Sequence, residues 1–498
     1  MVKISWDGSG TFAGANDDVS AYVRPPFTTT RGRANVNDVV GTGHGQLHLA
    51  NAGGRFSPYN TASPIYPNVL PARPILVQVT YNAVTYPVFK GKCTPEGMNT
   101  RDPAAAEVVF AMLDDYEGLR LGRTNTPLMS GQRVDQILGL ILDDVLWSAT
   151  ARTLDVGTVQ IGYFTNHNRL PLNALQLAEA QEPGSLLFMG RDGYVTWQNR
   201  NYRSLQTPYA VFSNTNFDSL DPQVRADDAI SSVRAVWPRL VAGEQPEAVF
   251  QLQRAVQVPS GVSSLLVEVN VTGVLGASSY LNPVATTDYL ANAISNGTGA
   301  DKTAQVSMVV ASSTAGDATL TVTNLDSLPA WIMPLTVRAT ALKAGGETQA
   351  YEAAVPSPAV ASQQQNREFT FLDDSSLVRG WVDYTAKASG GLRPRPVMRI
   401  TPSNDALMAT VLGADLSKRI TIADNTSAWQ TGVNGDFYIE NISLEWRSTK
   451  LLTATWTLFD ADRANGRFFR ISGTLGGGLD YSTISAASPA AVLDRIAF

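Results

Sequence analysis

The segment that most constrains the fold lies at residues 41–74, where a short strand leads into a loop rich in proline. Leu47 and Leu49 alternate with Gln46 and His48, which predicts a strand with one apolar face. The prolines that follow are Pro58, Pro64, Pro67, Pro71 and Pro74. Proline fixes φ and lacks a backbone donor, so we expect a stiff, extended loop outside any sheet interior.

Most of the remaining chain has the pattern of β-strands. Alternating or β-branched segments separated by Gly and Pro predict strands at residues 20–24, 75–80, 86–90, 107–115, 230–237, 397–400, 419–422, 437–447 and 451–459. From residue 259 to 360 the chain is rich in Ala, Ser, Thr and Val. Strand-like stretches at 265–271, 305–311, 318–323 and 335–342 there predict an inserted antiparallel β-sandwich.

Helices are predicted in a few places. Apolar residues spaced three and four apart predict an amphipathic helix at 131–148, with Ser130 as its N-cap. A second helix is predicted at 172–182, followed by a hairpin that turns at Asp192-Gly193. Asp373 and Asp374 open a third at 376–388, and residues 490–498 are expected to form a short helix or a tail.

Bulk properties exclude several functional classes. The net charge of −6 over 498 residues argues against a general nucleic-acid-binding protein. The single cysteine, Cys93, excludes an intrachain disulfide and a multi-cysteine metal site. The first residues lack a basic and apolar leader, and no stretch of 18 apolar residues occurs, so we expect neither a secretion signal nor a membrane-spanning helix.

The residues that could carry chemistry do not form a recognisable catalytic pattern. His44 and His48 share one strand face, but zinc needs three or four ligands, so we expect no metal site there or at His167. The adjacent acidic pairs point to opposite strand faces or cap helices; they are Asp114/Asp115, Asp143/Asp144, Asp227/Asp228 and Asp373/Asp374. Gly476, Gly477 and Gly478 lack the lysine of a phosphate loop. We therefore expect no catalytic, cofactor-binding or metal-binding residues, no cofactor and no enzymatic activity.

The nine tryptophans divide into two groups. Apolar neighbours predict core positions for Trp197, Trp237, Trp381, Trp446 and Trp456. Trp6, Trp331 and Trp429 lie near loops and are candidates for stacking on sugars or on a partner.

Several motifs, in order, resemble the tail-tip hub (baseplate hub, or minor tail) proteins of long-tailed, siphovirus-like bacteriophages. The first runs through Leu49, Asn51, Gly54, Arg55, Phe56, Ser57, Pro58, Leu70, Pro71, Arg73 and Pro74. The second comprises Ala174, Leu175, Leu177, Ala178, Glu179, Ala180, Gly184, Leu186, Asp192 and Gly193. A third, partial match has Asp227, Asp228, Ile230 and Val233, but Ser232 replaces a common asparagine. The resemblance covers roughly residues 15–460.

The resemblance implies a mainly β, multidomain protein with small α+β parts, tail-tube-like β-barrels and an inserted β-sandwich. The expected domains are a barrel at 1–110, an α+β hub domain at 111–200, a β segment returning to the hub core at 201–258, the sandwich at 259–360, a second barrel at 361–465 and a tail at 466–498. The barrel halves are expected at 1–110 with parts of 201–258, and at 361–465.

The implied function is a structural ring, a homotrimer that joins the sixfold tail tube to the threefold tip and lines the DNA exit channel. Its implied partners are distal tail and tube proteins, the tape measure protein, tip fibre or spike proteins, DNA in transit and the host cell surface. The chain would be made in the host cytoplasm and reside at the tail tip of the virion. Arg31, Arg33 and the loop 58–74 are our candidates for contacts between subunits.

Two alternatives remain at this point. One is a hexameric distal tail ring protein, which usually has a single tube-like domain and a shorter chain. The other is a glycan-binding module for the host surface, whose function would lie in residues 259–360. A wall-degrading enzyme is disfavoured because the chain continues only briefly after the expected barrel closure at about residue 465.

Overall fold

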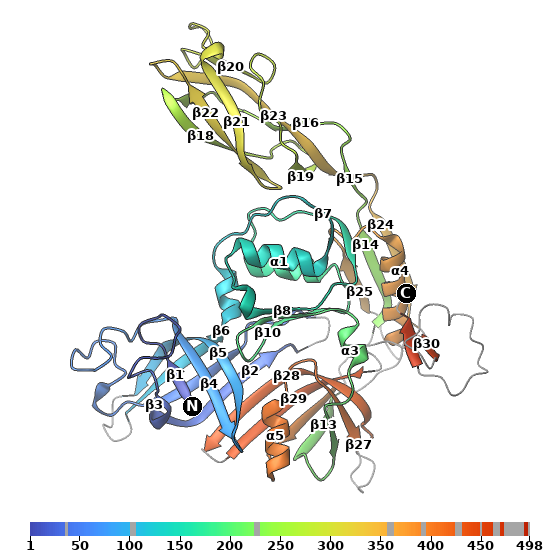
Figure 1. The fold of residues 1–498 in the computed structure, drawn as a ribbon. Coiled ribbons are helices and arrows are strands. Elements are labelled where there is room, and N and C mark those ends of the chain that lie inside the picture. Colours follow the sequence, from blue (N-terminus) through green and yellow to red (C-terminus); the bar gives the residue numbers. More distant parts are fainter. Residues whose placement is uncertain are drawn as a thin grey trace.

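The structure is a computed structural model that describes residues 1–34, 38–99, 106–223, 230–355, 363–389, 395–423, 431–448, 451–461, 469–472 and 493–496. A large β-sheet forms one end of the molecule, a helix-containing region lies in the middle, and an inserted β region extends from the opposite side (Figure 1). The predicted mainly β, multidomain class is confirmed. In the described parts of the chain, no helix has the length and apolarity that crossing a bilayer requires.

The large sheet has 12 strands and is built from two distant parts of the chain. Its first side contains, in spatial order, β1 (Val2–Ile4), β4 (Arg73–Tyr81), β5 (Val84–Asn99), β6 (Glu107–Asp114), β3 (His44–Ala50) and β2 (Val23–Gly32). Its second side contains β28 (Asn434–Ser448), β29 (Leu451–Asp460), β26 (Arg395–Ile400) and β13 (Ser219–Gln223), with β27 (Arg419–Ala423) and β12 (Ala210–Ser213) joined to β28.

The two sides meet where β2 pairs antiparallel with β28. Phe27 lies opposite Trp446, with ring centroids 5.0 Å apart, and Arg31 lies opposite Ile442. Phe27, Thr29 and Arg31 alternate with more exposed neighbours, so one face of β2 is buried along its whole contact with β28. One hydrophobic core therefore runs under both sides and contains residues as distant as Ile4 and Trp456.

This arrangement corrects two expectations. The two predicted β-barrels are instead two sides of one sheet, and among the described strands the hydrogen-bonded order runs from β1 to β13 without the ends pairing. Strands from the 201–258 segment were expected in the first barrel, but β12 and β13 pair with β27 and β26 of the second side. Pairing between distant strands decides both features, and the local sequence pattern contains no information about it.

The middle region packs helices and short strands around a second core. Its helices are α1 (Val134–Asp144), α2 (Pro171–Glu179), α3 (Tyr202–Leu205) and α4 (Ser375–Ala388). Its strands are β7 (Met129–Arg133), β8 (Arg152–Leu154), β9 (Gln160–Phe164), β10 (Leu186–Met189), β11 (Val195–Gln198), β14 (Ile230–Trp237), β24 (Gln349–Ala354) and β25 (Gln363–Glu368). Val378, Val382 and Ala386 of α4 are buried in this core. Val233 and Ala235 of β14 belong to the same core.

Local signals predicted α1, α2 and α4 of this region, with one error in a cap, whereas the short α3 was not predicted. The apolar stripe of α1 is buried as expected, and Asp374 caps α4 by accepting from the backbone N–H of Ser376 at 2.8 Å. Ser130 is not the N-cap of α1, because it lies in β7 and pairs with Tyr163 of β9. The helix begins after Arg133, whose backbone N–H donates to Gln136 Oε1 at 3.0 Å. The helix α5 (Asp405–Gly413), which covers the large sheet, was not predicted.

The inserted region consists of two sets of antiparallel strands around a third core. Strand β23 (Ala330–Ala344) pairs with β15 (Leu240–Ala242), β16 (Glu247–Gln251), β17 (Val256–Val258), β19 (Val274–Ser278) and β20 (Tyr289–Asn292). The second set is β18 (Gly261–Glu268), β22 (Asp317–Asn324) and β21 (Val306–Ser313). Near the end of the chain β30 (Phe469–Ser472) pairs with β31 (Leu493–Ile496), so the helix expected within 490–498 is wrong for residues 493–496.

Candidate functional site

The three histidines lie in separate settings, two beside a carboxylate and one exposed. His48 Nδ1 contacts Glu107 Oε1 across the β3–β6 ladder, and His167 Nδ1 lies 3.5 Å from Asp317 Oδ2. His44 is exposed on the same strand as His48. In the part of the chain that the structure describes, no three His, Cys, Asp or Glu side chains come together as metal ligands would.

The acidic pairs serve as caps and anchors. Asp143 Oδ1 accepts from Arg152 at 2.6 Å, and Asp144 Oδ2 accepts from Thr124 Oγ1 at 2.7 Å. Asp374 caps α4. Asp227 and Asp228 lie outside the described residues, as do the glycines at 476–478.

Asp114 is the exception among these pairs, because it is buried. It accepts from the backbone N–H of Gly43 at 2.6 Å and of Tyr116 at 3.0 Å. Burial raises its pKa to about 7, against the opposing effect of these hydrogen bonds and of Arg31. Burial also raises the pKa of the neighbouring Asp115, whose charge in turn contributes to the raised pKa of Asp114.

Cys93 and four of the tryptophans belong to the core. Cys93 is buried, and burial raises the pKa of its thiol, so it is not an activated nucleophile. Trp197, Trp237 and Trp456 are buried as predicted. Trp6 is also buried, with Nε1 donating to the backbone O of Asn16 at 3.0 Å, so its predicted role in stacking on a ligand is wrong. Trp331 is half-buried on β23, and Trp429 lies outside the described residues.

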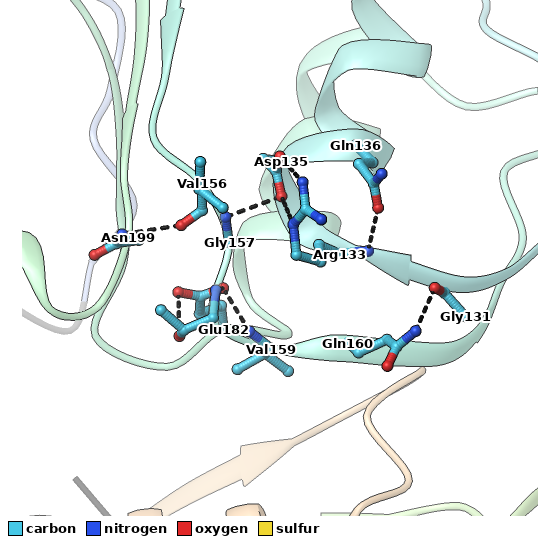
Figure 2. Close-up of polar contacts among 11 residues, drawn as sticks. Gly131, Arg133, Asp135, Gln136, Val156, Gly157, Val159, Gln160, Glu182 and Asn199 are labelled. Atoms are coloured by element: carbon cyan, nitrogen blue, oxygen red, sulfur yellow. Dashed lines mark hydrogen bonds and ion pairs between the residues drawn. The ribbon is translucent and has the colours of Figure 1, made fainter. Parts of the chain in front are cut away.

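A polar cluster that the sequence analysis did not identify surrounds the loop between β8 and β9 (Figure 2). On one side Asp135 of α1 accepts from Arg133 and from the backbone N–H of Gly157 at 2.9 Å. On the other side Glu182 accepts from Thr158 Oγ1 at 2.9 Å and from the N–H groups of Thr158, Val159 and Arg200. Both carboxylates are thus occupied by donors of the loop. Their arrangement fixes this loop against α1 and leaves little acceptor capacity for a reacting group.

A second buried cluster joins the middle region to both sides of the large sheet. Glu440 of β28 accepts from Arg33 Nε at 2.7 Å and from Arg203 Nη1 of α3 at 2.5 Å. Arg203 Nε also donates to Ser417 Oγ at 2.9 Å. The two guanidinium groups lower the pKa of Glu440 to about 2 although its burial acts in the opposite direction. The carboxylate is therefore charged at neutral pH and links three elements.

Arg31 makes a parallel link beside this cluster. Its Nη2 donates to Asp415 Oδ1 at 2.8 Å, and its Nη1 donates to the backbone O of Met189 at 3.3 Å. Arg191 of the β10–β11 hairpin contacts the same Asp415. The side chains of Arg31 and Arg33 are 7% and 8% exposed. Both arginines therefore contact this same chain, and the expectation that they contact a neighbouring subunit is wrong.

The loop 58–74, by contrast, is exposed and firmly held. Asn51 Oδ1 accepts from the N–H of Phe56 at 2.8 Å, and Ser63 Oγ donates to the backbone O of Arg55 at 2.6 Å. Phe56, Ile65 and Val69 are buried in the large core. Tyr59 is 91% exposed, Tyr66 45% and Leu70 47%. The loop is thus a fixed surface with large apolar side chains directed outward, which is the composition typical of protein contacts.

Several solved structures similar to this chain are described as tail proteins. A tail protein from Neisseria meningitidis MC58 matches with a TM-score of 0.49 and 9% identity, over 93% of this chain and 97% of that one. The 43 kDa tail protein of prophage MuSo2 from Shewanella oneidensis matches with a TM-score of 0.48, 9% identity and the same coverage. The E. coli c3393 protein, described as a component of the type VI secretion system similar to T4 tail proteins gp27 and gp5, matches with a TM-score of 0.37 and 8% identity, over 92% of this chain and 76% of that one.

At these identities the likeness concerns the fold alone. No protein-family model matches the chain, and no curated protein matches it in sequence.

Proposed function

We propose that this chain is a structural hub at the tip of a phage tail, where three copies form a ring around the DNA exit channel. The ring would join the sixfold tube to a threefold tip. It would contact distal tail and tube proteins on one side, and the tape measure protein and tip fibres or spike on the other. In this proposal the chain acts by shape and assembly, and no side chain catalyses a reaction.

The observation that supports the proposal most is the way one chain builds the large sheet from two sides. One chain supplies two six-stranded sides, joined edge to edge by β2 and β28. Three such chains in a ring would present six sides, which is the number needed to match a sixfold tube. A chain with one such side would need six copies for the same match, as in the distal ring alternative.

The buried ion pairs support this proposal because they make the two sides a single rigid unit. Glu440 on β28 is held by Arg33, which directly follows β2, and by Arg203 of α3. Loss of the Glu440 carboxylate would therefore disturb both the β2–β28 junction of the sheet and its contact with the middle region. A symmetry adaptor requires such a fixed angle between its two sides, since a ring closes only at one rotation per subunit.

The exposed loop 58–74 is the surface we assign to contacts between neighbouring subunits. Ring closure needs one patch to meet a different, complementary patch. Tyr59, Tyr66 and Leu70 offer apolar area on a backbone that is already ordered. Little conformational entropy is then lost when the contact forms.

Complementation of a phage genome that lacks this chain tests the proposed role. We expect particles without the chain to have no completed tail tip in electron micrographs, and we expect the wild-type chain supplied in trans to restore it. Particles with normal tips in the absence of the chain would contradict a structural hub. They would favour an accessory function such as adsorption.

A further inference from the structure

An open groove lies at the outer end of the inserted region. It has a volume of about 620 Å³ and is bordered by the segment 252–255, by β20 with the turn that follows it, and by the start of β23. In Figure 1 β20 lies at the end of the inserted region that is farthest from the large sheet. We call this feature the tip groove. Its volume is within the range of sites that bind small ligands, roughly 300 to 1,000 Å³.

The lining of the tip groove combines apolar walls with a few polar side chains. Leu252, Leu290 and Met333 contribute apolar surface, while Arg254 and Asp301 contribute one positive and one negative group. Arg254 is exposed and, within the described residues, makes no hydrogen bond or ion pair. Asp301 Oδ1 accepts from the N–H of Thr303 at 2.8 Å. The lining therefore offers free donors from Arg254 and remaining acceptor capacity on Asp301, with no net charge.

An aromatic side chain shares a strand face with one residue of the groove lining. Ala330 and Ile332 of β23 are buried, whereas Trp331 and Met333 are half-buried, so the latter two lie on the same outward face of the strand. Trp331 is also directly opposite Asn292, another residue of the lining. Trp331 is outside the lining itself, but it shares the strand face of Met333, so a ligand that extends from the groove along this face could stack on its ring.

The backbone around the groove is already hydrogen-bonded, which disfavours an added peptide strand as the ligand. One edge of β20 pairs with β23, and its other edge is engaged by residues 300–303, with Lys302 N–H donating to Ala291 O at 2.8 Å. Asn292 holds the following turn through Gly299, whose N–H and O it contacts at 2.9 Å. Strand addition requires a free edge, so recognition must come from side chains.

We propose that the tip groove binds a neutral oligosaccharide. Sugar hydroxyls both donate and accept, so they match the guanidinium of Arg254 and the carboxylate of Asp301 together, and a neutral ligand suits a lining without net charge. The C–H faces of a sugar ring match Met333, Leu252 and the ring of Trp331. The open shape of the groove leaves room for part of an extended oligosaccharide. This inference goes beyond the hub role and does not depend on ring formation.

Binding of the labelled full-length chain to an array of neutral and acidic microbial glycans tests the proposal, followed by titration with the best-bound soluble oligosaccharide. We expect neutral glycans to bind, and Arg254→Ala to weaken the titrated affinity roughly tenfold or more because a charged hydrogen-bond donor is lost. Arg254→Lys should recover only part of the affinity, since lysine cannot donate the paired bonds of a guanidinium. Trp331→Ala should also weaken binding.

Arg239→Ala is the matched control, because Arg239 is an exposed arginine that precedes β15 at the opposite end of the inserted region. It should bind glycans as the wild type does, and thermal melting should show all variants folded. Three results would each overturn the proposal: no neutral glycan bound by the wild type, binding only to acidic glycans, or equal affinity in Arg254→Ala and Arg239→Ala. Loss of binding in a folded Arg254→Ala with an unaltered ring would leave the hub proposal intact.

Discussion

Glu440 links the two sides of the large sheet to the middle region, because Arg33 and Arg203 both donate to it in a buried environment. Glu440→Gln leaves two buried guanidinium groups without their counter-charge. We expect it to lower the free energy of unfolding by about 3 to 5 kcal/mol, the usual cost of breaking a buried ion pair. Denaturant titration measures this change. The control is Glu445→Gln on the same strand, where an exposed pair with Arg447 is broken and little change is expected.

The same carboxylate makes stability depend on pH in the acidic range. Its folded-state pKa is about 2, below the ordinary value of 4.5, so the folded state favours the charged form. The resulting stabilisation is complete above about pH 4.5 and is lost as the pH falls toward 2. Wild-type stability should therefore fall over this range more steeply than that of Glu440→Gln. Parallel curves for the two proteins would contradict this account of Glu440.

Glu179 should make the stability of the folded state depend on pH in the opposite sense, near neutral pH. It is buried on α2, its Oε1 accepts from the N–H of Leu187 at 2.8 Å, and burial raises its pKa to about 7. The folded state thus holds a proton that the unfolded state has lost, and this contribution disappears as the pH rises from about 4.5 through 7. We expect Glu179→Gln to reduce the loss of stability between pH 5 and 8 by up to about 3 kcal/mol. Denaturant titration at several pH values measures it, and an unchanged slope would contradict the prediction.

At the scale of elements, the loop 58–74 should serve assembly and not folding. Tyr59 and Tyr66 are exposed, whereas Phe56, two residues before the loop, is buried. Tyr59→Ser combined with Tyr66→Ser should leave the melting temperature of the isolated chain within error but prevent tail-tip assembly in the complementation assay. Phe56→Ala should instead cost about 3 to 5 kcal/mol of stability. Normal assembly by the double tyrosine variant would place the subunit contact elsewhere.

The inserted region should be removable without loss of the hub. Ala242 of β15 lies directly opposite Leu342 of β23, so residues 243–341 can be replaced by an Asn-Gly turn that closes a two-residue hairpin. We expect the shortened chain to fold and to complete tail tips in electron micrographs, because its two other cores remain. If the tip groove binds glycans, adsorption to cells should fall. Failure of the folded, shortened chain to assemble would assign the inserted region to the ring.

Local sequence signals predicted single elements, whereas contacts between distant parts of the chain were not predicted. The apolar stripe of α1, the Asp192-Gly193 turn and the cap at Asp374 are local signals, and each predicted its element. The joining of the two sheet sides is not local, since Thr30 and Ser443 meet across 413 positions of sequence. Arg33 was interpreted as a surface contact for the same reason, because its partner Glu440 is 407 positions away.

For the candidate site, the sequence predicted a proline-rich loop outside the sheet interior, but it did not predict the tip groove. The groove combines residues 252–255, 290–301 and 333–334, which approach one another only when β17 and β20 pair with β23. Trp331 was identified from its place near a loop, and it is half-buried on the same face of β23 as Met333 of the lining. The sequence predicted which side chains alternate along a strand, but it did not predict which strands pair with one another.

At the scale of the whole molecule, the central claim is that three copies of a chain with two sheet sides match a sixfold tube. The most direct measurement is the copy number of this chain in purified tails, obtained by quantitative mass spectrometry and by image averaging of the tail tip without imposed symmetry. We predict three copies per tip, with each large sheet spanning one third of the ring. Six copies, each spanning one sixth, would contradict this claim and favour a distal ring.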